Sequence, residues 1–216
     1  MKNIPVILCT ASVFLFSCNN EAGGDKAKTD SATIAKPETK TEVAAPSMDP
    51  AAIKKIMKDF STPGDMHKWM AKLNGTREAT VIEFMNPEKP DTTKATNTVS
   101  MTLNGLYQVG RFTGKMMGSP FEGQSIMGYD NAKKLFVSTW IDNFSSGITQ
   151  FTGTYDEKTK TLNLKGHQTD PVSGNDVAIR EEMTMIDNDS YLMIMYGTGP
   201  DGKEAKFMEG TFHGTK

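Results

Sequence analysis

The sequence predicts an all-β fold, an antiparallel up-and-down β-barrel of about ten strands, with two short N-terminal helices packed on the barrel or capping it. From Thr76 onward, apolar and polar residues alternate with the period of two that is typical of strands with one buried face. Clusters of Asn, Asp, Gly and Pro interrupt the pattern roughly every ten residues, and such short connections join antiparallel neighbours. Closure of this meander into a barrel removes its exposed edges.

Two amphipathic helices are predicted before the first strand. Asp49 followed by Pro50 is a helix start signal, and the stretch from Thr62 repeats it. Apolar residues follow each signal with helical spacing. The first stripe consists of Ile53, Ile56, Met57 and Phe60, and the second of Met66, Trp69, Met70 and Leu73. Both stripes are interpreted as packing surfaces.

Composition excludes several classes of function. The chain of 216 residues has 24 Lys and Arg against 26 Asp and Glu, a net charge of -2, and no basic stripe, so nucleic acid is not expected as a partner. Its two cysteines, Cys9 and Cys18, both lie near the N-terminus. The domain downstream therefore has no disulfide, thiolate nucleophile or cysteine-ligated metal, and no cofactor is expected.

The N-terminus has the pattern of a bacterial lipoprotein signal. A charged start is followed by an apolar run from Ile4 to Phe16, which is too short to span a bilayer as a helix. The run ends in Leu15-Phe16-Ser17-Cys18, which resembles the lipobox, where signal peptidase cuts before a cysteine that becomes acylated. The resemblance implies a signal peptide at 1–17 and a lipid anchor on Cys18 as the only membrane contact. Asn19 after this cysteine implies the outer membrane of a diderm bacterium.

The remaining chain divides into a linker and one domain. Residues 18–48 are rich in charge and alanine and have no aromatic side chain, which predicts a disordered linker. Residues 49–216 are predicted to form the helix pair and the barrel.

One hairpin assigns the faces of two strands. Asn104-Gly105 is a preferred two-residue turn, so Met101 should oppose Gln108, and Leu103 should oppose Leu106. The apolar residues before this turn alternate with threonine and serine, which places Met101, Leu103, Gln108 and Phe112 inside the barrel.

The same parity argument predicts further inward residues. Phe136, Ser138, Trp140 and Asp142 share one face, which brings an aromatic ring and an acid together near a strand end. Glu181 shares a face with Met183, and the face of Ala205 and Phe207 also carries Glu209 and His213. Buried carboxylates need a partner, solvent or a ligand. A β-bulge that shifts the parity would instead turn these groups toward water.

Five motifs in this order resemble a bacterial family of unknown function, the domain-of-unknown-function family numbered 1579, over about His67 to His213. The motifs are Gly118-Ser119-Pro120-Phe121-Glu122-Gly123, Gly128-Tyr129-Asp130, Ser138-Thr139-Trp140-Ile141-Asp142, Asp170-Pro171-Val172-Ser173-Gly174 and Pro200-Asp201-Gly202-Lys203-Glu204. The resemblance implies a secreted or lipid-anchored barrel similar to the calycins, which include lipocalins and fatty-acid-binding proteins, and implies no activity. Gly75-Thr76-Arg77 is similar to the lipocalin Gly-X-Trp opening, with Arg77 in the place of Trp.

The leading functional hypothesis is a barrel that binds a small apolar or amphipathic molecule in a methionine-rich lumen. Its predicted ligand-binding residues are Met101, Gln108, Phe112, Phe136, Ser138, Trp140, Asp142, Glu181, Met183, Glu209 and His213. The alternatives are a structural or interaction domain of the envelope, haem or metal binding, and an enzyme. Haem or metal binding would use His67, His167 or His213, and an enzyme would use Glu181, Glu209 and Asp142. No catalytic residue or metal ligand is assigned.

Overall fold

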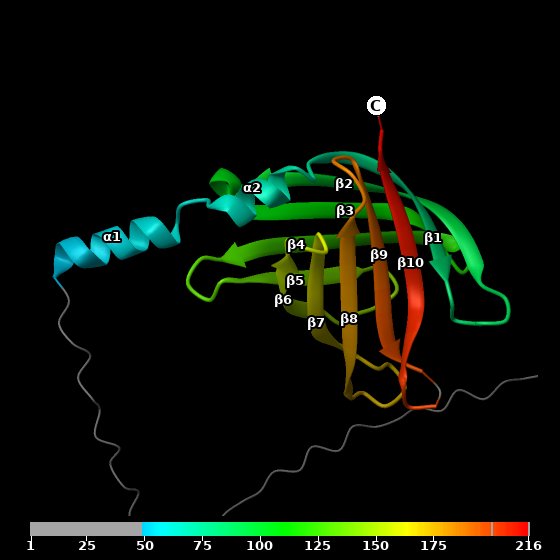
Figure 1. Cartoon of the computed structure of the whole chain (residues 1–216). Coiled ribbons are helices and arrows are strands. Elements are labelled where there is room, and N and C mark those ends of the chain that lie inside the picture. Colours follow the sequence, from blue (N-terminus) through cyan, green and yellow to red (C-terminus); the bar gives the residue numbers. More distant parts are fainter. Residues whose placement is uncertain (1–48, 200, 216) are drawn as a thin grey trace, which may run out of the picture. The chain divides into compact units, whose positions relative to one another are not determined.

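Ten antiparallel strands close into a barrel in the computed structural model, which describes residues 49–199 and 201–215 (Figure 1). Each strand pairs with its neighbours in the chain, and β1 closes the barrel on β10. The strands are β1 (Gly75–Glu83), β2 (Asp91–Thr102), β3 (Tyr107–Met116), β4 (Ser119–Asp130), β5 (Leu135–Asp142), β6 (Thr149–Asp156), β7 (Thr161–Thr169), β8 (Asp176–Met185), β9 (Ser190–Thr198) and β10 (Glu204–Gly214). The predicted closed barrel of ten strands is confirmed. The signal peptide, Cys18 and the linker lie outside the described residues.

The second helix, α2 (Asp65–Ala71), closes one end of the barrel. Its apolar face is buried, with Trp69 8% and Met70 0% exposed, and Leu73 just after the helix is also buried. Trp69 lies 5.5 Å from the ring of Phe136 and 4.7 Å from that of Tyr155, measured between ring centroids. The predicted role of the second stripe in packing is therefore confirmed.

The first helix, α1 (Pro50–Phe60), does not pack on the barrel, contrary to expectation. Its stripe is exposed, from 43% at Ile53 to 59% at Met57, and the helix buries no residue. The side-chain amide of Asn131, in the turn between β4 and β5, donates to the carbonyls of Phe60 and Thr62, both at 2.9 Å. These polar contacts hold the end of the helix while its apolar side stays uncovered. No described helix is long and apolar enough to cross a membrane.

Removal of residues 1–61 is expected to leave the melting temperature within about two degrees of that of a chain starting at residue 49. The physical reason is that α1 contributes no buried apolar side chain, and surface changes of this kind alter stability little. Calorimetry of the two chains makes the comparison. A loss of many degrees would mean that the stripe of α1 is covered in solution.

The hairpin between β2 and β3 has the predicted register through most of its length. Met101 pairs with Gln108 and Val99 with Gly110, as expected. Leu103, however, is 67% exposed and does not face the lumen. Leu103 and Asn104 both have positive φ, so the chain leaves the strand one residue earlier than a simple two-residue turn requires.

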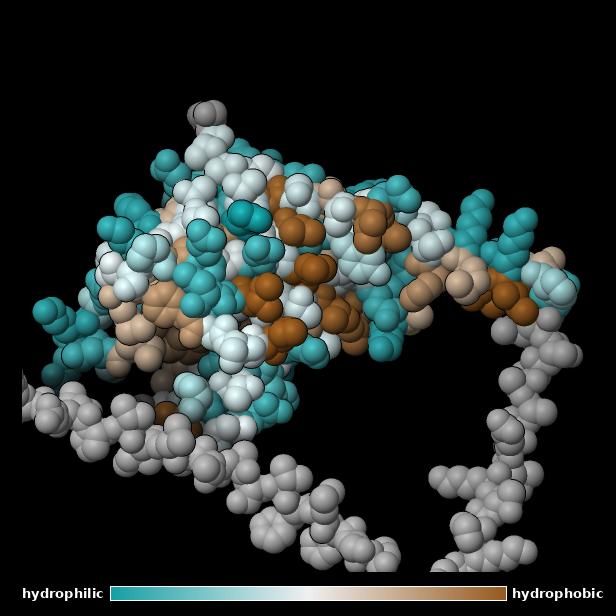
Figure 2. All heavy atoms as spheres, turned by 180° about the vertical axis from the view of Figure 1, so that it is seen from behind, coloured by the Kyte–Doolittle hydropathy of each residue, from teal (hydrophilic) through white to brown (hydrophobic). Residues whose placement is uncertain are grey.

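The outer surface is less polar than strict alternation predicts. Ile126 on β4 and Val137 and Ile141 on β5 face outward and are between 40% and 53% exposed. Figure 2 shows that apolar side chains gather on one outer face of the molecule.

A candidate ligand-binding lumen

Nine of the residues predicted to bind a ligand share the inner face of the barrel. Register connects them across the strands: Gln108 pairs with Met127, which pairs with Ser138, and Phe136 lies in one row with Gly153, Leu164 and Glu181. The nine are Met101, Gln108, Phe112, Phe136, Ser138, Trp140, Asp142, Glu181 and Met183.

The inward placement of Glu209 and His213 is wrong. The register between β10 and β9 shifts between Lys206 and Met208, and this bulge inverts the parity that Ala205 and Phe207 imply. Met208, Gly210 and Phe212 consequently face inward. Glu209 faces outward and its carboxylate pairs with the Lys206 ammonium at 2.6 Å, while His213 is exposed and its Nδ1 lies 3.1 Å from the Ser190 hydroxyl.

Three of the inward residues serve the closed end of the barrel. The Gln108 amide donates to the carbonyl of Met70 at 2.7 Å, which ties α2 to β3. Phe136 is fully buried beneath Trp69, and Met183 is also buried. These side chains form the floor of the lumen and fix the position of the helix that closes it.

Arg77 completes the floor and is a residue that sequence reasoning did not assign to the site. It is 3% exposed, and its guanidinium donates to the carbonyl oxygens of Leu73 at 2.5 Å and Asp189 at 3.1 Å. Its Cζ lies 5.8 Å from the centre of the Tyr191 ring. The resemblance to the Gly-X-Trp opening points to this position but gives no role for an arginine there.

An aromatic cluster lines the opposite, open end of the barrel. Trp140 stacks on Phe121 with centroids 6.3 Å apart, and Phe112 meets both rings edge to face. The indole N–H of Trp140 donates to Asp142 Oδ2 at 2.8 Å, and the amide of Phe144 donates to Oδ1 at 2.9 Å. Both oxygens of Asp142 are therefore occupied, and this acid orients the tryptophan at the mouth.

The Trp140 ring lies directly over Gly123, where a Cβ would overlap the indole carbons. We expect Gly123→Ala to displace the indole, to shift its fluorescence and to destabilise the domain by about 1–3 kcal/mol through overpacking. Denaturant unfolding followed by tryptophan emission measures both effects. Gly118→Ala is not a suitable control because Gly118 has positive φ, whereas Gly64→Ala meets only one atom, at 3.9 Å. An unchanged emission maximum in Gly123→Ala would contradict this placement of the indole.

Several side chains of the inner wall are only partly buried. Phe112, Glu181, Met193 and Met195 face inward and are half-buried, whereas other inward residues, among them Phe136, Leu164 and Ile179, are buried. Glycines also occupy inward positions, among them Gly153, Gly166 and Gly210, where a Cβ would overlap the backbone of a neighbouring strand or the ring of Phe212. The inner wall is thus mainly apolar and only partly buried, as expected for a barrel that holds a small molecule.

Glu181 is the most perturbed acid of this wall. Its register neighbours are Leu164 on β7 and Met195 on β9, and no described residue donates a hydrogen bond to its carboxylate. Burial raises the pKa of Glu181 to about 7. Burial also raises the pKa of Tyr191, whose hydroxyl accepts a hydrogen bond from the Asn97 amide at 2.9 Å.

Sequence reasoning also missed Glu83, the last residue of β1. It is 7% exposed, and burial raises the pKa of its carboxyl, with a further contribution from nearby Asp91. Arg77, Ala79, Val81 and Glu83 alternate along β1, so the parity argument that placed Glu181 inside would also have placed Glu83 inside.

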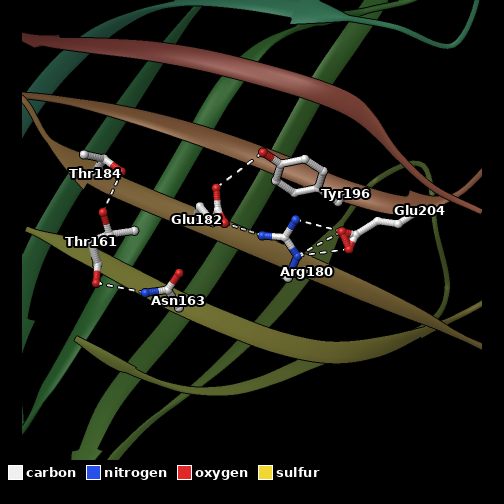
Figure 3. Close-up of polar contacts among 7 residues, drawn as sticks. All are labelled: Thr161, Asn163, Arg180, Glu182, Thr184, Tyr196 and Glu204. Atoms are coloured by element: carbon white, nitrogen blue, oxygen red, sulfur yellow. Dashed lines mark hydrogen bonds and ion pairs between the residues drawn. The ribbon is translucent and has the colours of Figure 1, made fainter. Parts of the chain in front are cut away.

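Polar residues on the outer face form a separate network. Arg180 pairs with Glu182 and Glu204, and its guanidinium carbon lies 3.8 Å from the centre of the Tyr196 ring (Figure 3). The Tyr196 hydroxyl donates to Glu182 at 3.3 Å. Arg180 holds the pKa of Glu204 below its usual value. Arg180 thus links β8 to β10 through Glu204 and packs on Tyr196 of β9, so the network ties the outer sides of these three strands together.

The histidines of the haem or metal hypothesis and the acids of the enzyme hypothesis do not come together in the structure. His67 is buried in α2, where its Nδ1 accepts from the Gly64 amide at 3.0 Å, while His167 and His213 face outward. Glu209 lies on the opposite side of the wall from Glu181. Within residues 49–199 and 201–215, no three His, Cys, Asp or Glu side chains are grouped as metal ligands.

The closed barrel, the helix across one end and the apolar lumen define a calycin-like domain. The chain belongs to the family described as protein of unknown function (DUF1579), whose model matches residues 62–213. The structure is similar to that of Rv2717c from M. tuberculosis, with a TM-score of 0.57 at 8% identity over 72% of this chain and 100% of that one. It is also similar to the S-type phycobiliprotein lyase CPES from Guillardia theta, with a TM-score of 0.50 at 8% identity over 74% and 97% of the chains. At such low identity these similarities establish the fold alone. No curated protein matches the sequence.

Proposed function

We propose that this protein binds a small amphipathic molecule in the lumen of its barrel. The observation that carries the proposal is the mainly apolar inner wall, on which Phe112, Met193 and Met195 are only half-buried and Glu181 has no hydrogen-bond donor among the described residues. An apolar chain would lie against the methionines and rings, whose flexible side chains adapt to its shape. The polar end would meet the carboxylate. A similar barrel occurs in a phycobiliprotein lyase, which supports the proposal that a barrel of this fold binds a small molecule.

Fluorescence titration with N-phenyl-1-naphthylamine, an uncharged apolar probe, tests the proposal. We expect micromolar binding with enhanced probe emission and a change in Trp140 emission, because Trp140 lies at the mouth. Phe112→Ala should weaken binding roughly tenfold, which corresponds to about 1.4 kcal/mol of lost apolar contact.

Ile126→Ala is the matched control, since Ile126 is apolar but faces outward. Absence of binding, or equal effects of the two substitutions, would contradict a lumen site. A structural or interaction role would then be the better interpretation.

We further propose that the domain is held at the cell envelope, at the outer membrane, by lipid on Cys18. The charged start, the apolar run and Leu15-Phe16-Ser17-Cys18 support this proposal. Cys18→Ala should accumulate as uncleaved precursor without acyl chains, which mass spectrometry of the protein measures. Normal processing of this variant would contradict lipidation, and fractionation of the two membranes tests the location separately.

A further inference from the structure

The inner wall of the barrel is acidic, and its charges distinguish between classes of ligand. Inward positions of the ten strands carry the carboxylates Glu83, Asp91, Asp142 and Glu181, and among the described strand residues the only inward cation is Arg77. Asp142 accepts hydrogen bonds from Trp140 and Phe144, and Asp91, which is exposed at the start of β2, accepts one from the Thr92 amide at 2.9 Å. Two acids, Glu83 and Glu181, therefore remain without a hydrogen-bond donor among the described residues.

These two acids lie on one row of the sheet. Glu181 pairs with Met195, Met195 with Met208, and Met208 with Glu83. Adjacent strands are about 4.8 Å apart, so the row spans three such steps around the curved wall. The acids thus flank two methionines, and the wall presents apolar and acceptor groups side by side.

Arg77 does not compensate for these carboxylates. Its guanidinium lies at the closed end, where it donates to the carbonyl groups of Leu73 and Asp189. Its donors are used by the backbone, and no lysine occupies an inward position of the described strands. A ligand carboxylate or phosphate in the lumen would meet like charges without a free cation, which is costly in a partly desolvated site.

We propose that the lumen selects an amphipathic molecule whose polar end is a cation or a hydrogen-bond donor, such as an alkyl amine, over one that ends in a carboxylate. The inference rests on the proposed lumen site and specifies its ligand class. An ammonium or hydroxyl group donates to Glu181 or Glu83, which supplies the partner that each inward acid lacks. The apolar chain then covers Met195 and Met208.

Competition against the naphthylamine probe tests this selectivity with three ligands that share a ten-carbon chain. Decylamine, decan-1-ol and decanoic acid are compared at pH 8, below the concentrations at which they form micelles. We expect decylamine to displace the probe at a concentration at least tenfold lower than decanoic acid, with the alcohol between them. Glu181→Gln and Glu83→Gln, which keep side-chain volume, should each reduce the preference for the amine.

Glu209→Gln is the control for attraction of the amine to the outer surface, because Glu209 faces outward beside Lys206. It should leave the preference unchanged. If decanoic acid competes as well as decylamine, or if Glu209→Gln reduces the preference as much as Glu181→Gln does, the inferred ligand class is wrong and the lumen site stands. If the probe itself does not bind, the proposed function fails, and the inference fails with it.

Discussion

Replacement of Trp69 by alanine is expected to destabilise the domain by about 3–5 kcal/mol, the range typical of removing a buried tryptophan. Trp69 is 8% exposed and packs on Phe136 and Tyr155 where α2 closes the barrel. The substitution leaves a cavity above the floor of the lumen, and the neighbouring rings belong to two different strands that cannot easily close it. Denaturant unfolding at equilibrium measures the change.

Phe60→Ala is the matched control for Trp69→Ala. It also removes an aromatic ring from a helix, but this ring is 48% exposed on α1. We expect a change within about 0.5 kcal/mol, as for other surface substitutions. Similar losses in the two variants would mean that α1 contributes to the core as much as α2 does.

Glu181→Gln is expected to stabilise the ligand-free protein above neutral pH by about 3 kcal/mol. The carboxyl has a pKa of about 7 in the fold against 4.5 ordinarily, so the folded chain holds its proton more tightly than the unfolded chain does. The stability that the protonated group contributes is complete below about pH 4.5 and is lost as pH rises through about 7. The free energies of unfolding of variant and wild type should therefore converge at low pH and diverge toward pH 8.

Urea unfolding of both proteins across this pH range measures the difference, and taking the difference removes the contributions of Glu83 and other groups. Glu209→Gln is the control because its outward carboxylate is paired with Lys206. A constant difference between wild type and Glu181→Gln at all pH values would show that this carboxyl is solvated rather than buried.

The barrel itself was predictable because strand period and turn chemistry are local properties. The turns between consecutive strands occur where Asn, Asp and Gly cluster, and the hairpin at Asn104 sets the pairing of Met101 with Gln108. Parity then gave the inward face of β5 and β8 correctly, because neither strand is interrupted by a bulge.

The sequence-based predictions fail where long-range packing determines which way a side chain faces or what covers a helix. The bulge between Lys206 and Met208 has no marker such as Gly or Pro, and it turns Glu209 and His213 outward. The stripe of α1 has the same spacing as that of α2, yet only α2 meets the barrel end. Periodicity shows that a face is apolar and does not show what covers it.

The candidate site was only partly predictable for a related reason. Sequence parity places a residue on the inner face but gives neither its depth nor its partners. Gln108 and Glu181 both face inward, but the first donates to α2 and the second has no partner. The parity argument could also have identified Glu83, whereas the contacts of Arg77 depend on the carbonyl of nearby Leu73 and on that of Asp189, which is 112 residues away in the sequence.

The most direct test of a ligand-binding lumen is NMR of the methionine methyl groups, labelled with carbon-13, as decylamine is added. Met193, Met195 and Met208 face the lumen, while Met57, Met85 and Met117 are between 59% and 74% exposed and serve as internal controls. We predict shifted resonances and nuclear Overhauser contacts to the alkyl chain for the first three methyls only. Contacts confined to the exposed methyls, with the lumen methyls unchanged, would contradict the proposed function.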